Sequence, residues 1–410
     1  MGLREDANRI IEAAIASAMP GEAVKRALSG KNFSSGRLIL VSVGKGGWQM
    51  AQSAWELLGD RIDSGVVITK YDHVKGSLGK LQLFEAGHPV PDENSFKATQ
   101  AAIDVVKGLT AEDTVLFLVS GGGSALFEKP LITPHELTRL TGELLSCGAD
   151  IVEMNTVRKR FSAVKGGRFA ELCAPAKVFS VVLSDIIGDP LDMIASGPAY
   201  PDSSTCEQAM GIVKKYNLTL TPAMEQLLQQ ETPKALSNVE TQITGSVRQL
   251  CTTAARVCTE LGYQPIVLST GLCCVAREAG SFMASIARSH EDSDRSLAFI
   301  AGGETVVHLT GKGLGGRNQE LALGAAQGIA GMENTAVFSV GSDGTDGPTD
   351  AAGGYVDGTT RDRLGQQGIH IFDVLQNNDA YHALQRCDGL IMTGATGTNV
   401  NDLSVVLLRR

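Results

Sequence analysis

The sequence predicts an α/β protein with two domains, the first of which holds a parallel sheet covered by helices on both faces. Short apolar runs rich in β-branched residues alternate with segments whose apolar residues recur every three or four positions, an order typical of a parallel sheet. The strands are apolar almost throughout, as expected when both faces of a sheet are buried. A chain of 410 residues is also longer than one hydrophobic core usually serves, which favours two domains.

The first domain begins with "MGLREDANRIIEAAIASAM", which predicts an amphipathic helix and lacks the apolar core of a signal peptide. After about residue 200 the chain becomes helical and polar, and we expect this stretch to connect the domains. Buried strands are expected at residues 37–43, 65–70, 114–120 and 178–184, and helices at 48–58 and 94–107.

The second domain is expected to hold a further set of strands and no internal repeat. We predict an N-terminal domain over residues 1–240 and a C-terminal domain over residues 241–410, with the boundary loosely placed between 235 and 290. The strands of the second set are expected at residues 265–270, 297–303, 305–310, 335–341 and 402–410.

Composition limits the classes of partner. The net charge of −9 argues against nonspecific nucleic-acid binding, which requires a basic surface, but it leaves room for a local basic pocket. The eight cysteines show neither a zinc pattern nor a disulfide framework. No apolar run approaches the ~18 residues of a membrane span. We therefore expect a cytoplasmic protein with neither nucleic acid nor membrane as partner, and the oligomeric state stays open.

Three consecutive glycines follow the apolar strand that ends near residue 120. A glycine inside an element costs about 1 kcal/mol relative to alanine, so Gly121, Gly122 and Gly123 need a reason. Glycines allow consecutive N–H groups to converge on phosphate oxygens, and Ser124 adds a hydroxyl. We predict a phosphate or carboxylate site here; the alternative is a plain strand-to-helix turn.

Basic residues occupy two further places. Lys45 lies between two glycines where a strand meets a helix, so it would add a cation to free helix amides; a solvated lysine is the alternative. The spacing of a Walker A loop is absent. Asn155 precedes the main basic concentration of this acidic protein, which is either a functional cluster or a solvated face. Its members are Arg158, Lys159, Arg160, Lys165 and Arg168.

Acidic residues follow several of the predicted strands. Asp185 and Asp189 lie after the strand at 178–184, and Glu304 ends the strand at 297–303. Carboxylates in such loops suit Mg²⁺, which commonly takes one or two of them together with phosphate oxygens. Asx turns are the competing interpretation.

The stretch "GKGLGGRNQELAL" satisfies GxGxxG, the pattern of a dinucleotide-binding loop, with glycines at 311, 313 and 316. The arginine that follows, Arg317, is unusual for that loop. At a helix start its planar guanidinium is suited to grip a carboxylate or phosphate in two hydrogen bonds. Glycines for phosphate, Lys45 and Arg317 as cations and acids for metal are together what phosphoryl transfer requires.

These loops also resemble those of one family. "AGHPVPDENS", "SGGGSALF", "NTVRKRFSAVKGGRFAEL", "SDIIGDPLDMIASGP", "GGRNQELAL", "GTDGPTDAAG" and "TGTNVNDL" are together similar to the class II glycerate 2-kinases, whose C-terminal module is the MOFRL domain. The resemblance covers nearly the whole chain. It implies a Rossmann-like N-terminal domain, a distinct C-terminal α/β domain and an active site in the cleft between them. It also implies ATP-dependent phosphorylation of D-glycerate to 2-phosphoglycerate with Mg²⁺.

By position, Lys45 and Arg317 match the family's active-site lysine and arginine. Their roles, on the phosphoryl oxygens and on the glycerate carboxylate, are interchangeable at this stage. The other expected contacts are nucleotide or phosphate at Gly121, Gly122, Gly123, Ser124, Asn155 and Lys159, substrate at Ser120, and metal at Asp185, Asp189 and Glu304.

Two other functions compete with the kinase. Family members have also been labelled hydroxypyruvate reductases, and the GxGxxG is the one feature that favours an NAD(P)H-dependent enzyme. The acidic residue that should follow a second strand and bind ribose is not where that fold needs it, so we favour the kinase. A sensing module that binds a ligand without turnover is the third reading.

Overall fold

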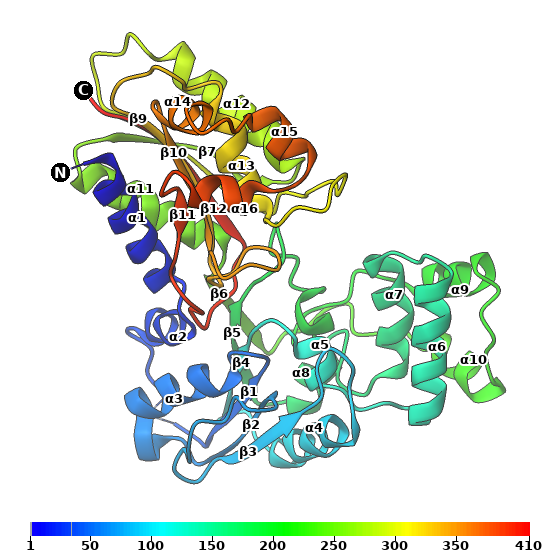
Figure 1. The fold of residues 1–410 in the computed structure, drawn as a ribbon. Helices are drawn as coiled ribbons and strands as arrows, with labels where there is room; N and C mark the ends of the chain where they lie inside the picture. The colour runs from blue at the N-terminus through cyan, green and yellow to red at the C-terminus, as the bar shows by residue number, and fades with distance from the viewer. Residues whose placement is uncertain (1, 34) are drawn as a thin grey trace. The chain divides into compact units, whose positions relative to one another are not determined.

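Residues 2–33 and 35–410 are described by the structure, a computed structural model, and they form two compact units (Figure 1). The N-terminal unit comprises Pro20–Ser184 and Asp189–Thr244, and the C-terminal unit comprises residues 2–19, Asp185–Gly188 and Gly245–Arg410. The division after Thr244 lies within the predicted range of 235–290, but two segments that precede it, residues 2–19 and Asp185–Gly188, belong to the C-terminal unit. In particular, the buried Asp6 carboxylate of the first helix accepts hydrogen bonds from Tyr263 and Arg409, at 2.6 and 3.1 Å.

The N-terminal unit is built on a six-stranded sheet with the order β3-β2-β1-β4-β5-β6. Each neighbouring pair from β3 to β5 is parallel, which confirms the parallel sheet predicted from the apolar strands. The order is that of the doubly wound dinucleotide-binding fold. The strands are β1 (Leu38–Val43), β2 (Ser64–Lys70), β3 (Gln82–Ala86), β4 (Thr114–Val119), β5 (Lys177–Leu183) and β6 (Val239–Gly245).

Helices cover both faces of this sheet (Figure 1). One face carries α2 (Pro20–Leu28) and α3 (Gly47–Leu58), and the other carries α4 (Glu93–Val105), α5 (Gly123–Leu126) and α8 (Arg168–Cys173). α4 begins at residue 93 because the Asp92 side chain accepts the Ser95 N–H while the Ser95 hydroxyl accepts the Asp92 N–H. Such a capping box satisfies backbone donors that a helix start otherwise leaves free.

A separate helical cluster extends the N-terminal unit. α6 (Pro134–Ser146), α7 (Ile151–Arg158), α9 (Cys206–Lys215) and α10 (Pro222–Leu228) surround their own apolar core. α9 and α10 come from the stretch expected to connect the domains. The sequence correctly indicates that this stretch is helical, but its apolar residues pack against α6 and α7 and so make it part of the fold.

The C-terminal unit holds a mixed sheet with the order β11-β10-β9-β12-β8-β7. β7 and β8 are parallel, whereas β12 runs antiparallel to both of its neighbours. The strands are β7 (Gln264–Leu272), β8 (Leu297–Gly303), β9 (Thr335–Gly341), β10 (Gly353–Asp357), β11 (Leu390–Ile391) and β12 (Asp402–Leu408).

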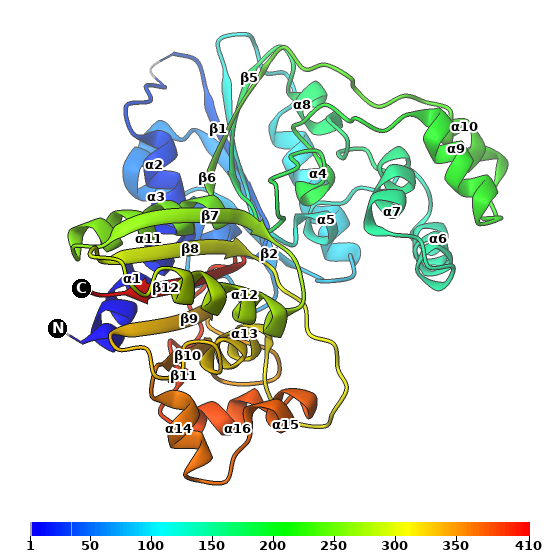
Figure 2. The same cartoon turned by 90° about the horizontal axis from the view of Figure 1, so that it is seen from above.

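Helices also cover both faces of the second sheet (Figure 2). α1 (Leu3–Ser17) and α11 (Val247–Glu260) lie on one face. The other face packs against α12 (Ala276–Ser289), α13 (Arg317–Ala326), α14 (Thr360–Gly365), α15 (Ile371–Gln376) and α16 (Ala380–Gln385). Across residues 2–33 and 35–410, no helix combines the length and the apolar character that a membrane crossing needs.

The strand predicted at residues 305–310 is wrong. These residues form an extended loop in which Val306 makes a single bridge to Val275. The N–H groups of Thr310 and Gly311 donate to the Asn378 side-chain oxygen, at 2.7 and 2.9 Å. A side chain therefore takes the place that a neighbouring strand would fill, and the alternating apolar pattern cannot reveal this.

The N-terminal unit contains a buried ion pair between Lys165 and Glu128, whose side chains are 0% and 1% exposed. The Lys165 ammonium also donates to the Ser124 carbonyl. Burial lowers the pKa of Lys165 to about 8, against the opposing pull of Glu128. The pair thus fixes the glycine-rich loop to the chain that leads into α8.

Replacing Glu128 with glutamine leaves the Lys165 ammonium buried without a counter-charge. We expect E128Q to lower the free energy of unfolding by about 3–5 kcal/mol. Urea unfolding followed by tryptophan fluorescence measures this, because Trp48 and Trp55 both belong to the N-terminal unit. The control is D104N, which removes an exposed pair with Lys107 and should leave the unfolding midpoint unchanged. Equal losses in both variants would contradict the assignment.

Candidate active site

The loops that follow β1 and β4 are tied together at the carboxyl ends of the parallel strands. The Lys45 N–H donates to the Gly121 carbonyl at 2.8 Å, and the Gly46 N–H donates to the Ser120 hydroxyl at 3.0 Å. Ser120 is 1% exposed, so its hydroxyl holds the two loops together. β1 and β4 are neighbours at the point where the strand order reverses, which is where ligands bind in open parallel sheets.

Lys45 and Gly122 lie side by side in this place. Lys45 is partly buried, and no carboxylate of the described chain forms an ion pair with its ammonium. Gly122 has φ +84°, a left-handed conformation that favours glycine. A Cβ atom at Gly122 would lie 3.1 Å from Lys45 Cγ and 3.0 Å from His88 Nε2. The loop therefore leaves an unpaired cation beside a bare backbone.

His88 is a neighbour that the sequence reasoning missed. It follows β3, two strands away from β1 in the sheet. Its motif was part of the family resemblance, but a single histidine gives no signal of its own. Only the strand order, which aligns the carboxyl ends of β3, β2, β1 and β4 along one edge, brings its ring to Gly122.

Ser124 and Asn155 are brought together through Ser196. The Ser124 and Ser196 hydroxyls are 2.9 Å apart, and the Ser196 hydroxyl donates to the Asn155 side-chain oxygen at 3.2 Å. Ala195 and Ser196 have φ +51° and +62°, a backbone conformation that costs ~1–3 kcal/mol and concentrates at functional sites. Loop 189–197 thus lies on the glycine-rich loop and continues the predicted ligand surface.

Most basic residues between 158 and 168 form ion pairs or hydrogen bonds within the N-terminal unit. Lys159 is 2% exposed and donates to Asp202 at 3.0 Å, Lys165 pairs with Glu128, and Arg168 donates to backbone carbonyls. Arg160 is fully buried, with Glu231 and Ser204 as partners. The solvated-face alternative is wrong. The nucleotide contact at Lys159 stays a prediction, which now competes with a buried ion pair.

Arg158 differs from the rest of the stretch. Its Nε atom is buried without a hydrogen-bond partner, and the described chain offers its guanidinium no ion pair. Its positive charge contributes to the lowered pKa of Lys165, after burial, so the two basic groups lie close together. An arginine left unpaired near the Ser124 loop is suited to bind an anion.

In the C-terminal unit, Arg317 begins α13 and is held by two acids. Its Nε and Nη2 donate to the Asp402 carboxylate at 2.6 and 3.0 Å, and its Nη1 donates to Glu304 at 2.8 Å. Burial alone would lower the pKa of the guanidinium, but the hydrogen bond and charge of Asp402 raise it above its ordinary value. The two-bond grip predicted for Arg317 is thus made with Asp402, a residue the sequence reasoning did not name as a site residue.

The predicted metal ligands separate between the units. Asn401 Nδ2 donates to Glu304 Oε2 at 3.3 Å and to the Asp185 carbonyl at 3.2 Å, so these two acids lie close together in the C-terminal unit. Asp189 belongs to the N-terminal unit, with one buried carboxylate oxygen that lacks a partner. In the part of the chain that the structure describes, no three His, Cys, Asp or Glu side chains gather as a metal centre.

The glycines of the GxGxxG stretch have a structural explanation. A Cβ at Gly311 would lie 2.3 Å from Asn377 Cα, and one at Gly313 would lie 2.4 Å from Asp379 Cβ. Residues 304–316 separate β8 from α13, whereas a dinucleotide loop turns directly from strand to helix. The glycines therefore admit a neighbouring chain segment, and the pattern does not support a dinucleotide site.

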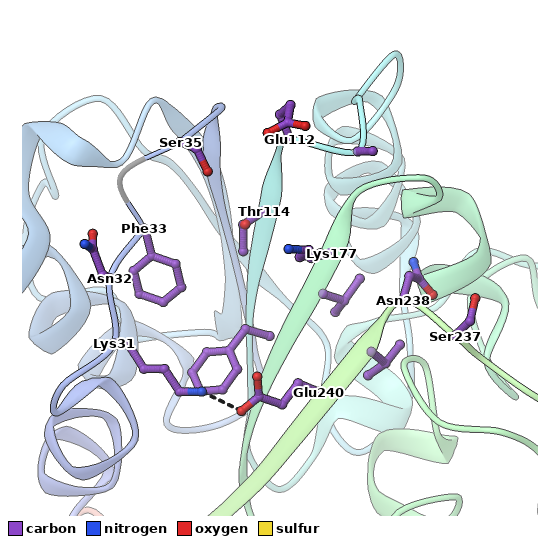
Figure 3. Close-up of a pocket in the computed structure, with 14 residues that line it drawn as sticks. Lys31, Asn32, Phe33, Ser35, Glu112, Thr114, Lys177, Ser237, Asn238 and Glu240 are labelled. Carbon is purple, nitrogen blue, oxygen red and sulfur yellow. Dashed lines mark hydrogen bonds and ion pairs between the residues drawn. The ribbon is translucent and has the colours of Figure 1, made fainter.

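A cavity of about 410 Å³ lies in the N-terminal unit, at the amino ends of β4 and β5 (Figure 3). The Lys31 ammonium there pairs with Glu240 at 2.5 Å and lies 4.6 Å from the centre of the Phe179 ring. None of the predicted site residues lines it. Because ligands of parallel sheets bind at the opposite, carboxyl ends, we do not assign the reaction to this cavity.

A second cavity, of about 730 Å³, lies next to Arg317 in the C-terminal unit. Loop 305–317 and the segment from Asp343 to Pro348 line it. Val306 and Leu309 are 47% and 83% exposed there, beside the cationic Lys312. A cavity that joins exposed apolar side chains to cations can accept an organic anion.

α13, and with it Arg317, is fixed by Asp346. The Asp346 carboxylate accepts the N–H groups of Asn318 and Gln319 at 3.1 and 2.9 Å. A Cβ at Gly316 would lie 2.2 Å from the Asp346 carboxyl carbon, so that position requires glycine. Burial raises the pKa of Asp346 to about 6, against the hydrogen bonds that favour its charge. The helix start that carries Arg317 therefore depends on a carboxyl that titrates near pH 6.

Comparison with known families divides the chain into two successive modules. Residues 6–229 match a domain of unknown function, DUF4147, and residues 297–402 match the MOFRL family. The D-glycerate 2-kinase of Thermotoga maritima is 50% identical over 99% of this chain and 98% of its own. A crystal structure of glycerate kinase from Thermotoga maritima, also 50% identical, superposes with a TM-score of 0.94 over 99% of both chains. A putative hydroxypyruvate reductase of Agrobacterium vitis is 37% identical over 99% of this chain and 94% of its own.

The raised pKa of Asp346 predicts a pH-dependent stability. The folded chain binds this proton more tightly than the unfolded chain, so ionising Asp346 costs stability as the pH rises from about 4 to about 6. Asparagine does not ionise, so D346N should gain stability relative to the wild type over that range, by up to about 3 kcal/mol. Calorimetric unfolding at several pH values measures the difference.

The matched control is D294N, because the Asp294 side chain is 94% exposed. Its stability relative to the wild type should not change between pH 4 and pH 6. If D346N followed the same flat course, Asp346 would be ionised in the folded protein throughout and the assignment would fail.

Proposed function

Because the chain belongs to the class II glycerate 2-kinase family, with a DUF4147 module followed by a MOFRL module, we propose that it phosphorylates D-glycerate with ATP. The products are 2-phosphoglycerate and ADP. The observation that carries the proposal is the joined pair of loops at the point where the strand order reverses, with the unpaired ammonium of Lys45 beside the glycine-rich turn. An unpaired cation beside free backbone favours an anionic ligand.

Lys45 neutralises the negative charge that spreads over the oxygens of the transferring phosphoryl group. Such charge stabilisation accounts for most of the catalysis in phosphoryl transfer, which asks for little covalent chemistry from the protein. The backbone around Gly122 and the hydroxyl of Ser124 bind phosphate oxygens. Arg158, which lies near the Ser124 loop without a counter-charge, supplements them.

Arg317 receives the glycerate carboxylate. Its Nε and Nη2 stay bound to Asp402, which fixes the plane of the guanidinium, while Nη1 exchanges the half-exposed Glu304 for the substrate. The roles of Lys45 and Arg317 remain interchangeable in this proposal, because both groups attract the same kind of anion.

The acids near Arg317 fit a magnesium ion. Mg²⁺ takes one or two carboxylates and fills its other positions with phosphate oxygens and water, so Glu304 and Asp185 are sufficient. Asp189, whose buried oxygen lacks a partner, belongs to the N-terminal unit and stays a separate prediction as a metal ligand. When bound, the ion neutralises the phosphate oxygens of ATP.

Hydroxypyruvate reduction is the alternative, since two similar proteins of Agrobacterium vitis are named putative hydroxypyruvate reductases. Gly311 and Gly313 pack against residues 377–379 and Gly316 packs against Asp346, which removes the one feature that favoured a nicotinamide cofactor. One assay separates the two activities. ADP release from glycerate, ATP and Mg²⁺ without NADH oxidation by hydroxypyruvate supports the kinase, and the reverse result overturns it.

Replacing Lys45 with alanine should lower kcat by about 10²–10³-fold, because the developing charge loses a fixed cation. The unfolding midpoint should stay near that of the wild type, since the ammonium has no ion-pair partner to lose. K97A is the control, as the Lys97 side chain is 69% exposed. Unchanged turnover in K45A would remove Lys45 from the site.

Replacing Arg317 with lysine should raise the KM for glycerate and lower kcat/KM by about 10–100-fold, because a point charge cannot hold Asp402 and substrate together. R256K is the control on an exposed pair. Circular dichroism must show that R317K is folded. If kcat/KM changes little, Arg317 has a structural role through Asp402 and not a substrate contact.

A further inference from the structure

His88 lies in contact with the proposed phosphate loop. It follows β3, at the edge of the sheet where Lys45 and Gly122 also lie. A Cβ at Gly122 would be 3.0 Å from both Cδ2 and Nε2 of the imidazole and 3.1 Å from Lys45 Cγ. The Nε2 edge of the ring therefore faces the glycine loop and the stem of Lys45.

The ring nitrogens of His88 are unused. Across residues 2–33 and 35–410, neither forms a hydrogen bond or an ion pair. The nearby carboxylates are engaged: Glu85 accepts the N–H groups of His73 and Val74, and Asp92 accepts from Tyr71 and Ser95. A partly exposed imidazole without a partner, next to an anion site, is available to a substrate.

Burial and the positive charges around the imidazole favour its neutral form. Burial, followed by the positive charges of Lys45 and Lys70, lowers the pKa of His88 below its usual value of 6.5. Asp92 faces the neighbouring Gly87, and its carboxylate is occupied by the partners named above. Near neutral pH the imidazole therefore keeps a free lone pair, as a proton acceptor must.

Few other groups at this edge of the sheet can take a proton. Lys45 is an ammonium, and the Ser120 hydroxyl is bound to the Gly46 N–H. Asp189 is the rival, because one of its buried oxygens lacks a partner. Loop 189–197 reaches the glycine-rich loop through Ala195 and Ser196, at the end of the loop away from Asp189, whereas the His88 ring lies against Gly122.

We propose, on the basis of the proposed kinase function, that His88 is the catalytic base of the transfer. As the 2-hydroxyl oxygen of glycerate bonds to the γ-phosphorus of ATP, its proton moves to Nε2 of the imidazole. The bond from the γ-phosphorus to the bridging oxygen breaks, and its electron pair leaves with ADP. The imidazolium then releases the proton to water, which restores the neutral ring.

The variant H88Q tests this, because glutamine keeps a polar side chain but cannot accept the proton. We expect kcat to fall by about 10²–10⁴-fold, while the KM values for ATP and glycerate stay close to those of the wild type. In the wild type, kcat/KM should rise with pH through the pKa of His88, below about 6.5, and H88Q should lack that rise. Added imidazole should restore part of the activity of H88G.

H135Q is the matched control, since His135 is exposed on α6, and it should keep the activity and the pH profile of the wild type. Tryptophan fluorescence must show that H88Q unfolds at the same denaturant concentration. If the wild type is an active kinase and H88Q keeps the acidic limb of the profile, the assignment to His88 is overturned. Loss of that limb in D189N instead assigns the proton to Asp189. A wild type without kinase activity overturns the proposed function as well.

Discussion

The hydrogen bond from the Lys45 N–H to the Gly121 carbonyl is the contact on which the proposed chemistry depends. It joins two loops that β2 and β3 separate along the chain, and it exists because β1 and β4 are neighbours in the order β3-β2-β1-β4-β5-β6. Parallel strands end at one edge, so their following loops must meet there. The cation, the bare glycine backbone and the imidazole of His88 are consequences of that order, since none of them is close to the others along the chain.

Most of the buried basic side chains of the N-terminal unit have partners within that unit. In the basic stretch from Arg158 to Arg168, three residues pair with Asp202, Glu231 and Glu128, and Arg168 donates to backbone carbonyls. Burying these groups is tolerable only because each has an ion-pair or hydrogen-bond partner. Among the described residues, Lys45 and Arg158 have no carboxylate partner, which suits them to bind an anion from solution.

In the C-terminal unit, the contacts hold the guanidinium of Arg317 in a fixed plane. Asp402 at the start of β12 and Asp346 beside the first turn of α13 both act on the same helix start. The long loop from residue 304 to residue 316 is fastened by the Asn378 side chain, so that it stays open on the side of the cavity. Rigid positioning of this kind is what a reaction governed by charge and orientation requires.

The amino-acid sequence by itself determined the class of fold and most strands of both sheets. It also determined the loops that carry Lys45, Gly121–Gly123 and Arg317. Both follow because apolar periodicity and glycine placement are local properties of a chain. It failed where a side chain replaced a strand, at residues 305–310, and where β-strands were short or partly polar, as in β3 and β6. Only the tertiary structure decided that Lys159 is neutralised, that Arg317 grips Asp402 and that His88 reaches the glycine loop. Those facts depend on which distant segments become neighbours, and pairing between distant charges leaves no periodic trace in the sequence.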